Sequence, residues 1–262
     1  MFLKKKTFQT ILITGASSGI GRALAHGYAA PNITLYLSGR NQKALEQVKQ
    51  QCQKKGAVVH YTAFDVSNDQ ALSNYIQTIT EPIDLIIANA GASGGNRRNG
   101  DPESLETINT LINVNLKAPI QLTRLLMDML MKQQNGHLVY ISSVQALRGF
   151  PHSPTYCATK AGLKAYSEGL RAWIKNKNID VSIVYPGFIK TAMSDRLDSP
   201  KPLMISAEKA AKHIQSAVAK NHTIIKLPNL IYYSVRLLDL LPIKWADFIL
   251  SFSKVDVPEP RK

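Results

Sequence analysis

Tyr156 and Lys160, a tyrosine and a lysine four residues apart, form the sharpest chemical signal in the sequence. On a helix, side chains at this spacing project from one face and can reach the same ligand. A free tyrosine has a pKa near ~10, so acid–base work near neutrality requires that pKa to fall by up to about 3, or roughly 4 kcal/mol. A neighbouring ammonium in a site shielded from water favours the phenolate in this way. The pair therefore predicts proton transfer, although the same spacing also fits a packed aromatic beside a surface cation.

A glycine-rich loop, Thr14–Gly21, is the second chemical signal, and its glycines are Gly15, Gly19 and Gly21. An apolar run precedes it, and we expect a helix to begin at Arg22. Glycines at such a junction allow a tight turn and let the backbone approach a pyrophosphate at the helix N-terminus. The loop therefore predicts a dinucleotide site, while a plain strand-to-helix turn is the alternative.

Short apolar runs alternate with longer segments in which apolar residues recur every three or four positions. The runs predict strands at Thr10–Thr14, Ile33–Ser38, Val58–Phe64, Leu85–Ala88, His137–Ser142, Val181–Tyr185 and Thr223–Leu227. The periodic segments predict helices near Arg22–Tyr28, Gln42–Lys54, Asn68–Thr78, Ser104–Met131 (broken near Leu116–Ala118) and Thr155–Asn176. This order predicts an α/β fold: a Rossmann-type, doubly wound parallel sheet flanked by helices on both faces. Ligands bind such sheets at the carboxyl ends of the strands, where the strand order reverses.

The end of the second strand indicates which nicotinamide cofactor binds. NAD enzymes usually carry an acidic residue there for the ribose 2′-hydroxyl, whereas this chain has Gly39 followed by Arg40. A guanidinium meets a 2′-phosphate with paired, charge-assisted hydrogen bonds. Arg40 therefore favours NADP(H), with NAD(H) as the alternative if Arg40 is only a solvated cation.

The loop spacing Gly-x-x-x-Gly-x-Gly, preceded by Thr14, resembles the short-chain dehydrogenase/reductase family. Ser143 lies 13 residues before Tyr156, and Asn115 lies 28 residues before Ser143, so the order is similar to the family's Asn-Ser-Tyr-Lys tetrad. Ser142 is the alternative serine, but the spacing favours Ser143.

The resemblance implies a role for each member of the tetrad. Tyr156 exchanges a proton with the substrate oxygen, and Ser143 hydrogen-bonds that oxygen and stabilises its developing charge. Lys160 lowers the pKa of the tyrosine and binds the nicotinamide ribose. Asn115 holds a water on the proton path to solvent.

The resemblance also implies a set of cofactor contacts at the ends of successive strands. Asp65 and Val66 contact adenine, and Asn89, Ala90 and Gly91 follow the fourth strand in a motif whose first family Asn is replaced by Ala88. The full implied cofactor set is Gly15, Ser17, Ser18, Gly19, Ile20, Gly21, Arg40, Asp65, Val66, Asn89, Ala90, Gly91, Tyr156, Lys160, Pro186, Gly187, Ile189 and Thr191.

Composition narrows the class of protein and its partners. The 262 residues are 45% hydrophobic, which is enough for one domain with a full core. The net charge of +14 suits nucleic acid, anionic lipid or a phosphorylated cofactor, but Lys and Arg are spread along the chain. Because no nucleic-acid-binding module is recognisable, we expect no specific nucleic-acid partner.

Two distant cysteines, Cys52 and Cys157, show no metal-ligand spacing and fit a reducing compartment. Neither His137 nor His152 has a metal-like partner, so no metal site is expected. The first apolar run leads straight into glycines, unlike a signal peptide, and no run of about 18 apolar residues occurs. We expect a cytoplasmic protein, with peripheral association at the inner face of a membrane as the alternative.

The C-terminal region departs from the family pattern. We divide the chain into a Rossmann-fold catalytic domain, 1–228, and a helical extension, 229–262. After the last strand the chain reads Pro228-Asn229-Leu230 where many members carry Asp-Gly-Gly at a tetramer contact, so we expect a homodimer and leave tetramer geometry open. Two apolar helices follow, within 230–252. Either they lie on an anionic membrane surface, with Lys220, Arg236, Lys244 and Lys254 near headgroups, or they cover the substrate pocket and a dimer interface.

Two loops are candidates for substrate contacts. Ala192–Ile205 falls where relatives place a substrate lid, and its short length and apolar surround suggest a hydrophobic carbonyl or alcohol substrate. The loop Asn96-Arg97-Arg98-Asn99 either lines the substrate mouth or is a solvated surface loop.

The sequence therefore predicts an NADP(H)-dependent oxidoreductase that moves a hydride to or from a carbonyl or secondary alcohol carbon. The alternatives are a cofactor-binding scaffold or regulatory protein without turnover and an NAD-dependent alcohol dehydrogenase. The complete set of Asn115, Ser143, Tyr156 and Lys160 argues against the scaffold, because binding alone does not need an acid–base pair.

Overall fold

A parallel β-sheet forms the centre of the computed structural model, which describes residues 6–96, 101–197, 200–252 and 260. Its strands are β1 (Thr10–Ile13), β2 (Thr34–Gly39), β3 (Val58–Ala63), β4 (Leu85–Ala88), β5 (Gly136–Ile141), β6 (Ile179–Pro186) and β9 (Ile224–Leu227). The order of these seven strands is β3-β2-β1-β4-β5-β6-β9, and every neighbouring pair is parallel. The chain moves outward from β1 on one side and from β4 on the other, which confirms the predicted doubly wound fold.

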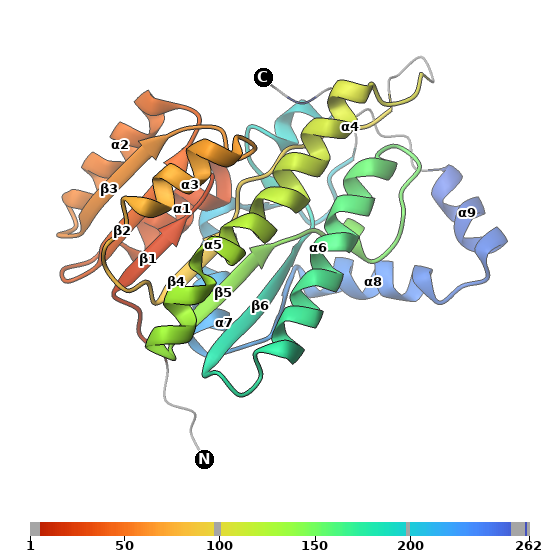
Figure 1. Cartoon of the computed structure of the whole chain (residues 1–262). Coiled ribbons are helices and arrows are strands. Elements are labelled where there is room, and N and C mark those ends of the chain that lie inside the picture. The colour runs from red at the N-terminus through yellow and green to blue at the C-terminus, as the bar shows by residue number, and fades with distance from the viewer. Residues whose placement is uncertain (1–5, 97–100, 198–199, 253–259, 261–262) are drawn as a thin grey trace.

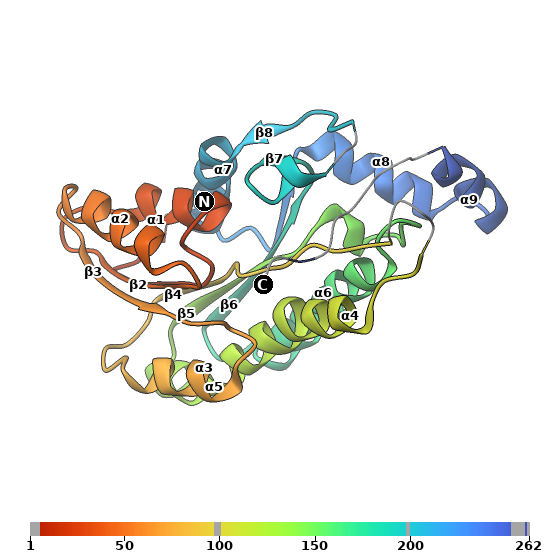
Figure 2. The same ribbon diagram turned by 90° about the horizontal axis from the view of Figure 1, so that it is seen from above.

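Helices cover both faces of the sheet (Figures 1 and 2). One face carries α1 (Gly19–Tyr28), α2 (Gln42–Gln53) and α7 (Ala207–Ala219). The opposite face carries α3 (Asp69–Gln77), α4 (Leu105–Ile112), α5 (Ala118–Gln133) and α6 (Pro154–Trp173). Side-chain oxygens of Asn41, Asn68, Ser104 and Ser206 accept hydrogen bonds from the first turns of α2, α3, α4 and α7. These caps satisfy amide groups that a helix leaves unpaired at its start.

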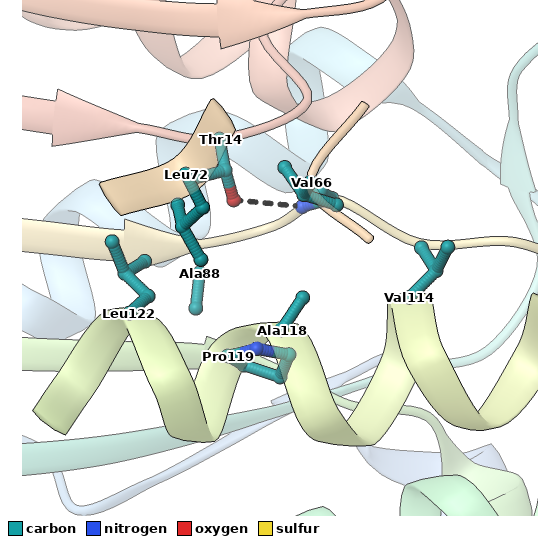
Figure 3. A pocket seen from close by; sticks show the side chains of 9 residues that line it. Thr14, Val66, Leu72, Ala88, Val114, Ala118, Pro119 and Leu122 are labelled. Carbon is teal, nitrogen blue, oxygen red and sulfur yellow. Dashed lines mark hydrogen bonds between the residues drawn. The ribbon is translucent and has the colours of Figure 1, made fainter. Parts of the chain in front are cut away.

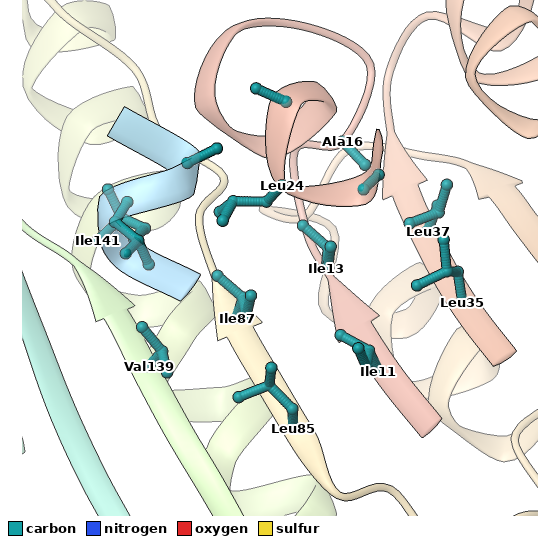
Figure 4. Packing of buried hydrophobic residues seen from close by; sticks show 14 of the residues in the cluster. Ile11, Ile13, Ala16, Leu24, Leu35, Leu37, Leu85, Ile87, Val139 and Ile141 are labelled. Atoms are coloured by element: carbon teal, nitrogen blue, oxygen red, sulfur yellow. The ribbon is translucent and has the colours of Figure 1, made fainter. Parts of the chain in front are cut away.

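The two faces of the strands build two separate hydrophobic cores, because successive strand residues point to opposite sides. In β1, Ile11 and Ile13 pack under α1, α2 and α7, whereas Leu12 joins the core under α3, α5 and α6. Figure 4 shows the first of these cores, with Ile87 and Val139 beside the β1 residues. Burial on both faces explains why the strands read as continuous apolar runs in the sequence.

Several element boundaries differ from the prediction. Helix α1 begins at Gly19, not at Arg22, since the last glycines of the loop already belong to the first helical turn. The helix expected to break near Leu116–Ala118 instead continues through a wide π-helical turn at Asn113–Lys117, where the Ala118 amide donates to the Asn113 carbonyl. Pro119 follows at once and has no N–H to donate, which fits such a local change of helical pattern.

Other elements were absent from the prediction or end elsewhere. Helix α7 has alanines on its buried side, a weak apolar signal, and two short strands, β7 (Ile189–Lys190) and β8 (Ile205–Ser206), pair in parallel. Helix α6 ends at Trp173, before the expected Asn176. After β9 the chain forms α8 (Asn229–Asp239) and α9 (Ile243–Ser251) at the end of the molecule remote from β3 and α2 (Figures 1 and 2).

Candidate active site

The glycine-rich loop lies at the carboxyl end of β1, where the strand order reverses between β1 and β4. Asn89 holds this junction together: its side-chain amide donates to the carbonyls of Thr14 (2.9 Å) and Gly15 (3.2 Å). In return, the Thr14 hydroxyl accepts the backbone amides of Asn89 and Ala90, each at 3.1 Å. Both predicted loops are thereby fixed at the carboxyl edge of the sheet, where ligands bind such folds.

Two glycines of the loop leave no room for a side chain. Gly15 has a φ of +68°, in the left-handed region that favours glycine, and a Cβ there would lie 2.8 Å from the Ala90 Cα. A Cβ on Gly21 would lie 2.4 Å from the Gly15 carbonyl oxygen and 2.5 Å from the Asn89 side-chain nitrogen. The close approach of backbone to backbone is the packing that the sequence predicted for a pyrophosphate loop.

The start of α1 is open to a ligand. Ser18 occupies the N-cap position, yet its side chain makes no capping hydrogen bond to any described part of the helix. Thr191, which directly follows β7, lies against this turn. A Cβ added to Gly19 would lie 3.0 Å from the Thr191 methyl carbon. Uncapped amides at a helix N-terminus form an anion site, so this geometry fits a diphosphate. The neighbouring loop residues Ser17 and Ile20 complete the turn, with Ile20 packed against the core.

Arg40 and Asp65 lie together at the ends of β2 and β3, with 3.8 Å between the Arg40 Nη1 and the Asp65 Oδ2. Both side chains are partly exposed, and such surface pairs contribute only about 0–1 kcal/mol, so a phosphate can compete for the guanidinium. The other Asp65 oxygen accepts from the backbone amide and the hydroxyl of Ser67, at 2.9 and 2.6 Å.

Val66 lines a small apolar pocket on the neighbouring strand ends (Figure 3). Its walls also include Ala90 and Val114, and Thr14 closes one side. Val66, one of the two residues to which the sequence assigned adenine contact, thus lies on the wall of a small apolar gap.

Tyr156 and Lys160 lie one turn apart on α6, as their spacing predicted. The Lys160 side chain is buried, and its ammonium donates to the Ile141 carbonyl at 3.1 Å and lies 5.6 Å from the centre of the Tyr156 ring. Ser143 hydrogen-bonds the Tyr156 hydroxyl from the end of β5. The structure thus brings these three side chains together.

The two serines at the end of β5 have different partners. The Ser142 hydroxyl donates to the Lys160 carbonyl at 3.1 Å and so anchors the backbone of α6. The Ser143 oxygen accepts the Gln145 amide at 3.2 Å and meets the Tyr156 hydroxyl. Only Ser143 therefore has its hydroxyl beside the tyrosine, which agrees with the serine that the spacing favoured.

Asn115 is buried in the π-helical turn, and its side-chain amide holds the loop segment that follows β4. Its nitrogen donates to the Ala92 carbonyl (2.9 Å) and to the Thr159 hydroxyl (3.4 Å), and its oxygen accepts the Ala92 amide (2.8 Å). These contacts use both amide hydrogens, so a water at this place would have to meet the second lone pair of the oxygen or the main chain. Gly91, next to Ala92, favours the close approach of Asn115, since a Cβ there would lie 3.3 Å from the Asn115 Oδ1.

Burial sets the protonation of the site. It raises the pKa of Tyr156 to about 12, although part of this residue reaches solvent, and the Ser143 hydrogen bond acts in the opposite direction. Burial also lowers the pKa of Lys160 to about 8. The Lys160 ammonium does not offset this effect of burial, so the phenol keeps its proton. Lys160 is therefore the group whose pKa lies near neutrality.

The segment after β6 closes the site. The Gly187 amide donates to the Leu227 carbonyl at 2.6 Å, which fixes the Pro186–Gly187 turn, and Ile189 is buried in the core. The β7–β8 pair joins the two ends of the predicted lid, and the Thr191 and Ser194 backbone amides each donate to the other residue's hydroxyl, at 3.0 and 3.2 Å. In the predicted loop 96–99, the Asn96 backbone amide donates to the His152 carbonyl. Its neighbours Arg97 to Asn99 lie outside the described residues.

Two residues with a part in this architecture were not singled out by their sequence: Ala92 as partner of Asn115, and Thr159. Thr14 was named in the glycine motif, but not as a hydrogen-bond acceptor. The Thr159 hydroxyl also donates to the Tyr156 carbonyl at 2.7 Å. Ala92 binds through its backbone groups, which every residue has, so its residue type does not reveal the contact. Among the described residues, no group of three or more His, Cys, Asp or Glu side chains is placed to hold a metal ion.

A family model described as short chain dehydrogenase matches residues 9–202. A ketoacyl reductase of Nostoc sp. is 33% identical over 224 residues, which are 83% of this chain and 77% of that protein. A sepiapterin reductase of Chlorobaculum tepidum is 30% identical over 230 residues, covering 82% and 93% of the two chains.

Solved structures share the fold. An alcohol dehydrogenase of Thermococcus sibiricus complexed with 5-hydroxy-NADP superposes with a TM-score of 0.73 at 24% identity, over 84% of this chain and 94% of that one. A short-chain dehydrogenase of Sphingobium yanoikuyae in complex with NADPH gives a TM-score of 0.76 at 22% identity, over 93% of each chain.

Proposed function

The chain belongs to the short-chain dehydrogenase family and is an oxidoreductase of that family, and we propose that it transfers a hydride between NADP(H) and a carbonyl or secondary alcohol carbon. The observation that carries this proposal is the group of Ser143, Tyr156 and buried Lys160 at the strand edge that also holds the glycine loop. The reductase names of the two relatives, and the NADP-type ligands of the two solved structures, agree with it.

In the proposed reduction, the bound cofactor supplies the hydride and the protein supplies the proton. Tyr156, protonated because burial raises its pKa, donates its hydroxyl proton to the substrate oxygen as the charge on that oxygen develops. Ser143 donates a hydrogen bond to the same oxygen. The buried Lys160 ammonium favours the phenolate that remains, since a positive charge in a low-dielectric site stabilises a nearby anion.

The proposed roles of Lys160 and Asn115 also include the cofactor and the proton path. Lys160 would donate hydrogen bonds to the nicotinamide ribose hydroxyls. Asn115 acts mainly as a positioning residue in this proposal, because its amide holds the Ala92 backbone against α6, and a proton-relaying water would bind beside it.

The proposed cofactor site uses the backbone of Gly15–Gly21 and Thr191 for the diphosphate, Asp65 and Val66 for adenine, and the Pro186–Ile189 segment for the nicotinamide. Asn89 and Ala90 keep this loop in place. NADP(H) is preferred in this proposal because Arg40 stands where a carboxylate would repel the 2′-phosphate, and NAD(H) binds more weakly.

The substrate in this proposal is a hydrophobic carbonyl compound, and the protein works in the cytoplasm as a homodimer. Exposed apolar side chains on α4 and α6, namely Leu105, Ile112 and Trp173, are those that a dimer contact would cover.

Fluorescence titration with NADPH and NADH, beside an Arg40→Asp variant, tests the proposal. Tighter binding of NADPH than of NADH, lost or reversed in the variant, is the expected result. Equal binding of the two cofactors would overturn the NADP preference. Binding without turnover on any member of a carbonyl panel would favour the scaffold alternative.

A further inference from the structure

Helix α8 is apolar on both of its sides. Its inner side packs on the body of the protein through Tyr232 and Val235, which are buried. Its outer side carries a second stripe at helical spacing, Leu230, Tyr233, Leu237 and Leu240, and all four side chains are exposed. The outer side of a surface helix is normally charged or polar, so this exposed apolar stripe is unusual.

Helix α9 has its larger apolar side chains on the outside. Ala246 and Leu250 are its buried residues. Trp245, Phe248, Ile249 and Phe252 follow the i, i+3, i+4, i+7 spacing of one helix face, and all four are exposed, with Trp245 at 65% and Phe252 at 70%. We call the outer stripes of the two helices the α8–α9 face. Exposed apolar side chains in such numbers mark an interaction site.

The charges around this face favour an anionic partner. The two acidic residues of α8 and α9, Asp239 and Asp247, both lie near the Arg148 guanidinium, at 4.0 and 3.2 Å, and Asp239 also pairs with Arg236. Lys226 lies over the Tyr233 ring, 4.3 Å from its centre, and donates to the Tyr233 hydroxyl at 2.6 Å. The acidic groups are thus neutralised, while basic groups remain beside the apolar stripe.

A lipid surface fits this face better than a second copy of the chain. The net charge of +14 draws the protein to anionic headgroups. Tryptophan and tyrosine rings, with lysine heads beside them, are the side chains that settle at the boundary between headgroups and acyl chains. In the described part of the chain no helix has the length and apolar character to cross a membrane, so the contact is with the surface.

We propose that the α8–α9 face docks on an anionic lipid bilayer. Docking would set the active site close to the lipid, because the inner side of α8 forms a wall of that site. Tyr232 meets Tyr185 edge to face with 5.3 Å between ring centres, and a Cβ on Gly187 would lie 3.4 Å from Ile231. Both views show α8 and α9 together at one end of the molecule (Figures 1 and 2).

Tryptophan fluorescence tests the docking directly. The chain has two tryptophans, so a Trp173→Phe protein reports on Trp245 alone. Mixed phosphatidylcholine–phosphatidylglycerol vesicles should shift its emission to the blue and sediment the protein at low salt. Phosphatidylcholine vesicles should bind it less, and salt should weaken the binding, since screening reduces attraction to anionic headgroups.

The double variant Phe248→Ser, Phe252→Ser should weaken vesicle binding by about tenfold or more, since two phenyl groups are then no longer available to be buried in the apolar layer. Because both residues are exposed, this change should leave the fold and NADPH binding as they are. Leu105→Ser, an equally exposed apolar residue on α4, is the matched control and should bind vesicles like the wild type.

Absence of both sedimentation and a blue shift on anionic vesicles would overturn the proposal, as would equal binding by the double variant. Self-association in sedimentation velocity that the double variant abolishes, without vesicle binding, would assign the face to a second copy instead. The vesicle assay needs neither cofactor nor turnover. A failure of NADPH binding would therefore contradict the proposed function and leave the docking result standing.

Discussion

The Lys160 ammonium lies 5.6 Å from the centre of the Tyr156 ring and donates its hydrogen bond to the Ile141 carbonyl, not to the phenol. The lysine is therefore held by the strand edge, and the tyrosine hydroxyl is directed to Ser143. In this arrangement the proton donor and the cation that favours its anion are separate groups with separate titrations, and each can be tested alone.

Replacing Tyr156 by Phe should lower turnover by ~10²–10⁴-fold, because the change removes the only proton donor that the proposal places on the substrate oxygen. NADPH affinity should change little, since the glycine loop is on other elements. Steady-state kinetics and a fluorescence titration of the same preparation separate the two effects. Full activity in the variant would rule out this mechanism.

The pH profile of reduction should show an alkaline limb near the Lys160 pKa of about 8. The lysine must be charged to favour the phenolate, so kcat/KM for NADPH, which reports ionisations of the free enzyme, should fall as pH rises through this value. The fall should approach tenfold per pH unit. Because burial holds the pKa of Lys160 well below 10, this lysine is neutral at pH 10. A profile that stays flat to that pH would therefore show that the lysine charge is not needed.

Ser143→Ala and Ser142→Ala form a matched pair with different expected defects. Ser143→Ala should lower kcat by about 10²-fold or more, as removal of an oxyanion donor does, with little change in the unfolding temperature. Ser142→Ala breaks the hydrogen bond to the Lys160 carbonyl and should cost about 1 kcal/mol of stability with a smaller loss of kcat. The reverse pattern would assign the substrate contact to Ser142.

The motifs located the site because each one depends on local spacing. A Cβ added to Gly15 or Gly21 would lie only 2.8 or 2.4 Å from a neighbouring backbone atom, so the loop excludes side chains there. That constraint is visible directly in the residue types. The continuous apolar runs likewise indicate strands that are buried on both faces. These features made the parallel sheet and the order of the motifs predictable.

The contacts that were missed depend on partners remote in sequence or on the backbone. Asn115 binds the Ala92 main chain across 23 residues, and no side-chain pattern records such a bond. The π-helical turn that replaces the predicted break contains Asn115, whose partners Ala92 and Thr159 are remote in sequence. The pKa of Tyr156 could not be inferred either, because the burial that raises it depends on the packing of remote segments.

Gly21→Ala should weaken NADPH binding and cost about 1–3 kcal/mol of stability, because the added Cβ would lie 2.4 Å from the Gly15 carbonyl oxygen. Gly169→Ala on α6 is the control: a Cβ there meets nothing within 4 Å, and alanine should raise the free energy of unfolding by about 0.5–1 kcal/mol. NADPH titration and chemical unfolding of both variants check this. Tight NADPH binding by Gly21→Ala would contradict the proposed loop.

His137 should make the fold less stable in acid. The Ser182 hydroxyl donates to the His222 carbonyl at 2.7 Å, so at 2.7 Å from the His137 Nε2 it accepts that N–H, and the Nδ1 carries the lone pair. This Nδ1 is buried and has no hydrogen-bond partner among the described residues. Burial lowers the pKa of His137 to about 4. A proton on the Nδ1 would have no acceptor, so the neutral ring is the folded form.

In the unfolded chain a histidine has a pKa near ~6.5, so between that pH and about 4 the unfolded state binds the extra proton. The contribution of His137 to stability is therefore complete above pH ~6.5 and is lost as pH falls, by at most about 1.4 kcal/mol per pH unit. Urea unfolding of wild type and His137→Gln at several pH values isolates this slope, because glutamine does not ionise. If the His137→Gln variant is too unstable for unfolding measurements, NMR of the labelled His137 ring carbons in the wild type reports the same titration. Parallel slopes for the two proteins, or a charged imidazole at pH 5.5, would show that burial does not keep this histidine neutral.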